Sequence, residues 1–470
     1  MTHFVACMVL PLAASLALRA PAGVAAATSA VPAARQEPYR PSADTTSRRG
    51  QLDSVLAAAT FDSAWRTVGT SLENRGVRRD DWPAVRLELR PAAARATTDS
   101  ALRAVIDTML RRLGESHFAV LPGGERAAAA EAGAPPRAAA LGTVSIDPRI
   151  VDGHLVVWRA DTAGAARRAG LAPGWTLERI EDFIVPSAIP RSRDSDAGGR
   201  RVAVLTGALR ALHGVPGSTV QIVARDERGE RHTLSVARDS VHGPTFQFGN
   251  LPPLPAGLVL TRRTTADGRC IGVIAFEYWL PPVMPAMDRA VDAVRGCAGI
   301  VLDLRGNLGG VAGMVMGVAG HFMTEPRALG TMRSRGEEMR FVANPRRATD
   351  AGAAVQPFGG PLALLVDELS ASTSEMFVVG LQSLGRARVF GERSAGQALP
   401  AMATRLPNGD VLMYVVADFV APDGSRIEGR GVIPDEHVPL DRNDLRAGRD
   451  ASLEAAVRWI ERARLASLPQ

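Results

Sequence analysis

The stretch that most constrains this chain spans residues 366–375 and reads V-D-E-L-S-A-S-T-S-E. The apolar run P-L-A-L-L-V at 361–366 leads into it, with the length and composition of a buried strand. Residues 376–384 follow with apolar side chains at helical spacing. The pattern therefore predicts a buried strand, a tight serine-rich turn and a helix.

A turn of this kind is suited to a nucleophile, because free backbone N–H groups and the positive end of the helix dipole point at one spot. The candidates are Ser370, Ser372 and Ser374. The turn alone also permits a simpler interpretation, in which the serines only cap the helix and Glu375 completes a capping box.

Four segments resemble, in the same order, the motifs of the tail-specific (C-terminal-processing) serine peptidases and of the tricorn peptidase core. S-A-S-T-S-E at 370–375 resembles the nucleophile motif, whose middle serine is Ser372 here. The other three are D-L-R-G-N-L-G-G at 303–310, G-E-R-S-A-G-Q at 391–397 and I-E-G-R-G-V-I-P-D at 427–435. The resemblance covers most of residues 110–440. It implies an α/β fold with a spiral β-α core of the ClpP–crotonase type.

The resemblance also bears on the general base that a serine nucleophile needs. In the C-terminal-processing branch the base is a lysine at the position of Gln397, but all 55 basic residues of this chain are arginine. A Ser–Lys dyad is therefore impossible. The tricorn-like branch implies a tetrad instead, with Ser372 as nucleophile, His117 as base, and Ser116 and Glu428 orienting the histidine. Alternatives remain: His117 could be an incidental histidine, and Glu428 a charge at a strand edge.

An oxyanion hole needs two aimed N–H donors. The resemblance places one at Thr373 and the other at Gly309 or Gly310. Asp303, Arg305 and Asn307 are better interpreted as the structural frame of that loop. A histidine base would lose activity on the acid side near its reference pKa of about 6.5, unless its surroundings shift that value. No spacing typical of metal ligands or of a phosphate-binding loop occurs, so we expect no metal and no cofactor.

The chain divides into several expected regions. Residues 1–30 are apolar and alanine-rich and are typical of a secretory signal peptide, with a single membrane anchor as the alternative. The remaining regions are a linker at 31–50, an N-terminal helical domain at 51–122, a PDZ-like β-rich domain at 141–240 and a serine peptidase core at 256–466. No later segment is long and apolar enough to span a membrane, so we expect no stable insertion after signal removal.

Export implies an oxidising compartment, periplasmic or extracellular. Cys270 and Cys297 each begin a predicted core strand on either side of one helix, at 283–294. Because such strand starts lie at the same edge of a parallel sheet, we predict a disulfide between the two cysteines. The alternative is two small buried residues.

Apolar periodicity sets further expectations in the helical domain and the core. Leu52, Val55 and Leu56 share one helix face, and Asp99 or Ser100 could cap a later helix. Alternating strands and helices indicate βαβ units on a mainly parallel sheet. The expected strands are 270–278, 300–304, 362–366 and 388–390, and the expected helices are 283–294, 311–323, 372–384 and 450–463.

In the PDZ-like domain we expect a peptide C-terminus to add as a strand beside Val144, with its carboxylate on the N–H groups near Leu141 and Gly142. Residues 186–200 are expected to form an inserted loop, and residues 217–236 a hairpin about an Arg-Gly turn. The partners would then be polypeptide substrates, possibly recognised by their C-termini.

The formal net charge of +6 and scattered arginines argue against nucleic-acid binding. The sequence thus predicts an exported serine endopeptidase that cleaves unstructured or C-terminally exposed polypeptides. Two alternatives remain: a catalytically inactive protein on the same fold that binds peptides or hydrophobic ligands, and an esterase with the same Ser–His pair. The oligomeric state is left open.

Overall fold

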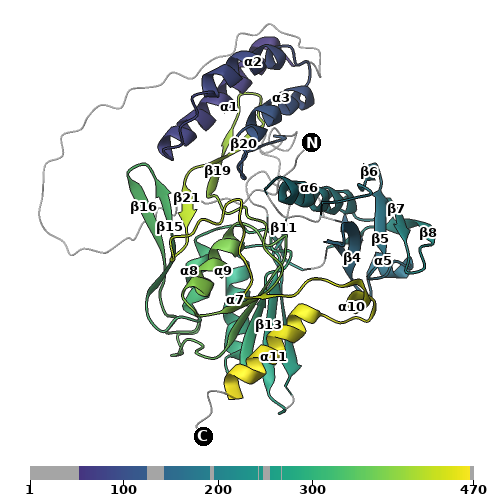
Figure 1. Cartoon of the computed structure of the whole chain (residues 1–470), viewed down its shortest axis with the longest axis vertical. Helices are drawn as coiled ribbons and strands as arrows, with labels where there is room; N and C mark the ends of the chain where they lie inside the picture. Colours follow the sequence, from purple (N-terminus) through teal and green to yellow (C-terminus); the bar gives the residue numbers. More distant parts are fainter. Residues whose placement is uncertain are drawn as a thin grey trace, which may run out of the picture.

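The computed structural model describes residues 52–123, 142–190, 195–241, 243–246, 254–265 and 267–465. The expected signal peptide, the linker at 31–50 and Leu141 lie outside these residues. Figure 1 shows three parts: a helical group (α1–α3), a β-rich unit carrying α6, and a core built on one large sheet.

The core sheet has six strands and is mainly parallel, as expected. Its order is β12 (Leu258–Thr264), β13 (Cys270–Phe276), β14 (Gly299–Asp303), β17 (Leu362–Val366), β18 (Arg388–Gly391) and β22 (Glu436–His437). Only β12 runs antiparallel to its neighbour. The α/β prediction is therefore confirmed, and the strand expected at 362–366 has the observed bounds.

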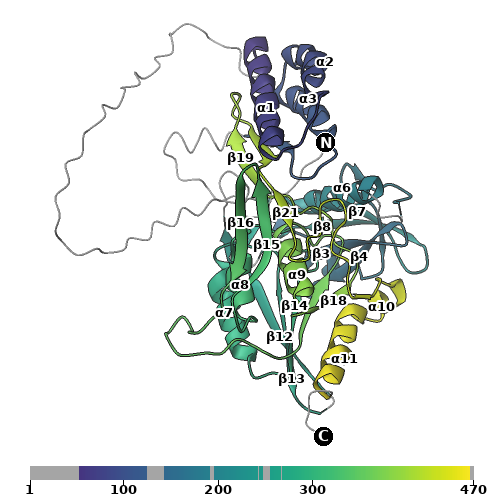
Figure 2. The same ribbon diagram turned by 60° about the vertical axis from the view of Figure 1, so that its left-hand side comes forward.

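Helices cover both faces of this sheet (Figure 2). On one side lie α7 (Val283–Val294), α8 (Met314–Gly320) and α9 (Thr373–Ser383), and on the other lies α11 (Ala451–Leu465). Leu302 and Leu364 pack with the first group, whereas Val301 and Leu365 pack with Ile460 of α11. Successive strand residues point to opposite faces, so strands covered on both sides are apolar throughout.

The helical group contains α1 (Ser54–Asn74), α2 (Trp82–Ala94) and α3 (Asp99–Arg111). The face expected from Leu52, Val55 and Leu56 is wrong, because Val55 is 73% exposed and the buried stripe of α1 runs through Ala57 and Phe61. Val55 lies about 200° around the helix from Ala57. The cap of α3 is Thr98, whose hydroxyl accepts from the N–H of Ala101, and not Asp99 or Ser100.

A short strand ties the helical group to the core. β1 (Ala119–Leu121) pairs antiparallel with β20 (Val411–Val415), which also pairs with β19 (Ala401–Arg405). The pairing sets Ala119 opposite Met413. Residues 116 and 117 come just before β1. The pairing of β1 with β20 therefore places them beside segments of the core that lie far away in the sequence.

Residues 142–240 form the β-rich unit, which has its own apolar core. Its main sheet has the order β3-β4-β5-β7-β8, with β6 beside β5. The bounds are β2 (Gly142–Thr143), β3 (Ile146–Val151), β4 (His154–Ala160), α5 (Ala165–Arg168), β5 (Thr176–Ile180), β6 (Phe183–Ile184), α6 (Ser195–Leu212), β7 (Thr219–Arg225), β8 (Arg231–Ala237) and β9 (Asp239–Ser240). The β7–β8 hairpin is as expected. The loop expected at 186–200 is wrong at its end, because α6 begins at Ser195.

The remaining elements are β10 (Thr245–Phe246), β11 (Leu254–Pro255), β15 (Arg327–Ser334), β16 (Glu337–Ala343), β21 (Asp418–Val420) and α10 (Arg442–Arg446). They lie around the core, except α10, whose Leu445 packs against Val156 and Trp158 of the β-rich unit. Cys270 and Cys297 form the predicted disulfide, with 4.9 Å between their Cα atoms. Among the described residues, no helix has the length and apolar character needed to cross a membrane.

Candidate active site

Ser372 lies in the turn between β17 and α9, as the sequence predicts. Its backbone angles are φ 56° and ψ −115°, a conformation that residues other than glycine rarely adopt. Its N–H donates to the Glu375 carboxylate at 3.0 Å. A strained strand-to-helix turn of this kind presents a nucleophile at the end of a sheet, and the surrounding contacts must hold it there.

His117, Ser116 and Glu428 form one hydrogen-bonded chain, although Glu428 lies more than 300 positions further along the sequence. Ser116 Oγ lies 2.6 Å from His117 Nδ1 and donates to Glu428 Oε2 at 3.0 Å. The Ser116 N–H also donates to Glu428 Oε1 at 2.8 Å. Because the single hydroxyl proton of Ser116 points to the carboxylate, Ser116 Oγ accepts a hydrogen bond from a protonated His117 Nδ1. The other ring nitrogen, Nε2, is then the unprotonated one and can act as a base.

Burial changes the protonation of both ends of this chain. It lowers the pKa of His117 to about 4 and raises the pKa of Glu428 above its usual range, although hydrogen bonds from Ser116 and Ala398 oppose the second shift. Burial disfavours the charged form of each group. His117 is therefore neutral at pH 7, and the acid limit expected near 6.5 from sequence does not apply to it.

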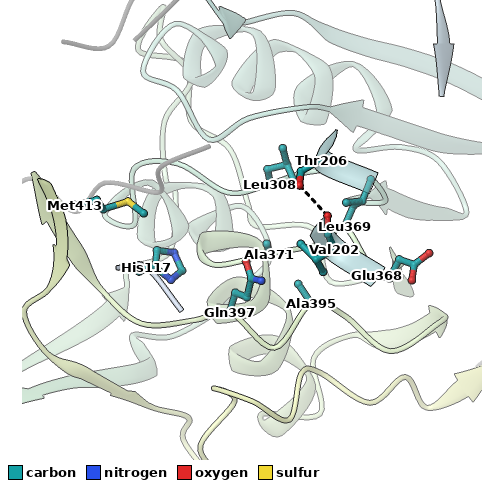
Figure 3. A pocket seen from close by; sticks show the side chains of 10 residues that line it. All are labelled: His117, Val202, Thr206, Leu308, Glu368, Leu369, Ala371, Ala395, Gln397 and Met413. Atoms are coloured by element: carbon teal, nitrogen blue, oxygen red, sulfur yellow. Dashed lines mark hydrogen bonds between the residues drawn. The ribbon is translucent and has the colours of Figure 1, made fainter. Parts of the chain in front are cut away.

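His117 lines a cavity next to the turn between β17 and α9 (Figure 3). We call this turn the nucleophile turn after its predicted role. Ala371, the neighbour of Ser372, and Gln397 also line the cavity. Further lining comes from Val202 and Thr206 of α6, and from Leu308, Glu368, Leu369, Ala395 and Met413. Within the described residues, Ser372 Oγ and His117 Nε2 share no hydrogen bond. Catalytic hydrogen bonds are often long without substrate and tighten when it binds.

Two backbone N–H groups beside Ser372 are available to an oxyanion. Those of Thr373 and Gly310 have no acceptor among the described residues, whereas the N–H of Gly309 donates to Asn307 Oδ1 at 2.9 Å. The Thr373 hydroxyl donates to the Gly310 carbonyl at 2.9 Å and holds the two segments together. Of the two glycines considered from sequence, the geometry favours Gly310 and disfavours Gly309.

The frame predicted for the glycine-rich loop is confirmed. Arg305 makes two hydrogen bonds to the buried Asp303, at 2.8 and 2.6 Å, and two to Asp450. Asn307 donates from its side chain to the carbonyl of Phe276 at 2.9 Å. These contacts hold the loop from below, and none of them uses the N–H of Gly310.

Sequence reasoning missed two buried ion pairs behind the nucleophile turn. Arg149 Nε lies 2.5 Å from Asp367 Oδ2, and Arg201 Nη2 lies 2.7 Å from Glu368 Oε2. Both arginines belong to the β-rich unit. The only signal in the sequence was the pair of acidic residues directly after an apolar strand, which nothing local links to residues 149 or 201.

The peptide-binding edge expected at Leu141, Gly142 and Val144 finds no support among the described residues. The N–H of Gly142 donates to the Gly214 carbonyl at 2.8 Å, and its strand pairs with β9. Val144 is fully buried and its carbonyl accepts from Ala166. Strand addition at this point would require these partners to separate, because the backbone groups are already used.

One group of side chains in the described residues could hold a metal ion. Asp226, Glu230 and His232 bring their ligand atoms within 4.8 Å of one another on the β7–β8 hairpin. His232 already bonds to Asp226 at 3.0 Å, and Asp226 caps the hairpin turn. This group lies outside the candidate active site, and the expectation of a metal-free mechanism remains a prediction.

Comparisons with known proteins show which proteins this chain resembles in sequence and in fold. Residues 270–438 match the sequence profile of peptidase family S41. The chloroplastic carboxyl-terminal-processing peptidase 2 of Arabidopsis thaliana is 26% identical over 392 residues, which is 81% of this chain and 68% of that protein. The carboxyl-terminal-processing protease of Synechocystis is 28% identical over 49% of this chain and 54% of that protein. The matched region thus spans half to two thirds of these relatives.

Solved structures show the same fold. The photosystem II D1 C-terminal processing protease matches with a TM-score of 0.54 and 21% identity, covering 86% of this chain and 96% of that one. Mature CPAF matches with a TM-score of 0.57 and 13% identity, covering 87% and 97%. The chain is thus similar in sequence to carboxyl-terminal-processing peptidases, and the solved structures show that it shares their fold.

Proposed function

We propose that this chain, a relative of the serine peptidases of family S41, is an endopeptidase in which Ser372 attacks and His117 acts as general base. The observation that carries the proposal is the chain from Glu428 through Ser116 to His117, which ends in the cavity next to the nucleophile turn. These three residues would supply the general base that the polypeptide, which has no lysine, needs from another side chain.

The proposed mechanism begins when His117 Nε2 takes the proton of Ser372 Oγ as the oxygen attacks the substrate carbonyl. The N–H groups of Thr373 and Gly310 stabilise the resulting oxyanion. The imidazolium is stabilised through Ser116 by Glu428. His117 then gives its proton to the leaving amine, and water releases the acyl group by the same steps.

Substrates of this enzyme would be unstructured polypeptides. The cavity lies between the core and α6 of the β-rich unit and is lined mainly by small and apolar side chains, including Ala371, Ala395 and Met413. An extended segment fits such a site better than a folded chain. Glu368, which is paired with Arg201, and Gln397 also line the cavity. The apolar part of the lining favours small apolar residues at the cleaved bond, because a charged side chain would lose its hydration beside it.

We further propose that the protein works outside the cytoplasm. The Cys270–Cys297 disulfide supports this location, because such bonds persist in oxidising compartments. The apolar, alanine-rich residues 1–30 are typical of an export signal.

The test is kcat/KM for an unstructured peptide, together with labelling by a fluorophosphonate probe. Ser372→Ala and His117→Ala should each lower kcat by roughly 10³-fold or more, and the double variant should be hardly worse. Ser116→Ala and Glu428→Gln should cost about 10- to 100-fold, because they orient the imidazole without bond making.

Near-wild-type turnover by His117→Ala would sink the proposed base. A protein that hydrolyses esters but no peptide would be an esterase, and one that does not label at all would be the inactive binding protein. The matched control is His437→Ala. It changes an exposed histidine in β22, the strand that pairs with β18.

A further inference from the structure

The fully buried carboxylate of Glu375 takes no direct part in the proposed reaction, yet it accepts four hydrogen bonds close to Ser372. Oε1 accepts from Ser394 Oγ at 2.5 Å and from the Gly396 N–H at 2.7 Å. Oε2 accepts from the N–H groups of Ser372 at 3.0 Å and Gln397 at 2.8 Å. Three of the four partners are backbone N–H groups, which can only donate, and the Ser394 hydroxyl donates when the carboxylate is ionised.

The segment 394–398 carries these contacts onward to the base. Its residue Ala398 donates its N–H to Glu428 Oε2 at 3.0 Å, the same oxygen that accepts from Ser116 Oγ. Consecutive amides, those of Gln397 and Ala398, therefore bind two different buried carboxylates. One carboxylate holds the nucleophile turn, and the other holds the histidine.

Building on the proposed function, we infer that Glu375 is a positioning residue, which uses segment 394–398 to hold Ser372 in register with the His117–Ser116–Glu428 chain. In this chain the segment has no lysine to contribute, and its backbone takes on the role of a spacer between nucleophile and base. Gly396 suits this role, because it has a φ of 71° and a Cβ there would lie 3.0 Å from the Gly431 nitrogen.

The positioning depends on the charge state of Glu375. A protonated carboxyl could still contact Ser394 by donating to its hydroxyl, but a neutral carboxyl accepts hydrogen bonds less strongly than a carboxylate, so the three N–H contacts would weaken. Burial raises the pKa of Glu375 to about 7, although the four hydrogen bonds oppose the shift. The active form is the ionised one, so activity should fall as the pH drops through about 7, well above the range in which His117 protonates.

No charged side chain is among the hydrogen-bond partners of Glu375 in the described residues. Charged or titratable groups on the elements around it make other contacts: Arg393 donates to the Gly429 carbonyl, Glu428 binds Ser116, and Arg305 binds Asp303 and Asp450. Others on these elements are His117, His321, Arg327, Arg333, Arg388 and Arg430. The neutral donors therefore dominate its immediate surroundings.

The experiment compares wild type with Glu375→Gln and Glu375→Asp, and uses Glu73→Gln, an exposed glutamate on α1, as the matched control. The readouts are kcat/KM and the rate of fluorophosphonate labelling between about pH 5 and 9. Wild type and Glu73→Gln should show an acid limit near pH 7. Glu375→Gln should be about 10- to 100-fold slower at pH 8 and should lack that limit, with Glu375→Asp in between.

Hydrogen exchange supplies a readout that needs no activity. In Glu375→Gln, amide exchange should rise in peptides covering 370–376 and 394–398 and stay unchanged in α7 and α11. A wild-type protein that hydrolyses no peptide, together with the expected rise of exchange in Glu375→Gln, would overturn the proposed function. The structural role of Glu375 in holding the two segments would then still stand. Wild-type activity of Glu375→Gln at pH 8, or a wild-type protein whose activity shows no acid limit down to about pH 5, would overturn the role of Glu375. The wild-type pH profile decides this even where a variant does not fold.

Discussion

Replacing Arg201 by methionine should destabilise the protein strongly, because the buried Glu368 carboxylate loses the guanidinium that balances its charge and keeps the Ile150 N–H, at 3.3 Å, as a neutral donor. Arg201 Nε and Nη2 lie 2.8 and 2.7 Å from Glu368 Oε2, and both side chains are only 6% exposed. Removing one member of such a pair typically costs about 3–5 kcal/mol, whereas replacing both by apolar residues is often nearly neutral. Arg201→Met should therefore be far less stable than Arg201→Met/Glu368→Met.

The assay is urea unfolding followed by tryptophan fluorescence and circular dichroism, arranged as a double-mutant cycle. The matched control is the Arg333–Glu338 pair, which has a similar separation of 2.8 Å but side chains that are 53% and 54% exposed. That cycle should give a coupling of about 0–1 kcal/mol. A coupling for Arg201–Glu368 no larger than the control would refute the reasoning.

Two buried ion pairs, Arg149–Asp367 and Arg201–Glu368, bear on the role of the β-rich unit. Arg149 and Arg201 come from this unit and bind the two residues that follow β17, just before the nucleophile turn. If the unit only presented substrates, deleting it would raise KM for proteins and spare the hydrolysis of small esters. The contacts argue for a larger effect, because the deletion removes the arginine partners of the buried Asp367 and Glu368 carboxylates.

Three further predictions concern the β-rich unit, the disulfide and the proposed oxyanion donor Gly310. Deleting residues 141–238 should lower kcat for a small ester as well as for peptides, and unchanged ester turnover in a folded deletion variant would contradict the ion-pair argument. Cys270→Ser/Cys297→Ser should lose about 3.5 kcal/mol of unfolding free energy, the value for a loop of 27 residues, measured against wild type without reductant. Gly310→Ala should lower kcat by about 10²–10³-fold, because a Cβ would lie 2.3 Å from the Trp279 carbonyl and displace an oxyanion donor; Gly313→Ala, whose Cβ meets nothing within 4 Å, is the control.

Local patterns in the sequence were sufficient for much of the core. The strand at 362–366 and the helix at 283–294 were predicted with the observed bounds, because an apolar run and a helical stripe are visible within a few residues. The disulfide followed from the same local reasoning about strand starts. Ser372 and its turn could be placed for the same reason, since strand, turn and helix are contiguous.

Tertiary structure alone decided how distant segments meet. The pairing of β1 with β20 places His117 beside a turn that is 255 positions later, and no local pattern encodes that register. The preference for Gly310 over Gly309 rests on the hydrogen bond that the Gly309 N–H donates to Asn307 Oδ1, and the exposure of Val55 depends on which face α2 and α3 cover. The four donors around Glu375 come from two segments that only folding brings together. Periodicity within one segment reports what that segment can bury, whereas a catalytic site depends on contacts between segments, which are set by the packing of the whole chain.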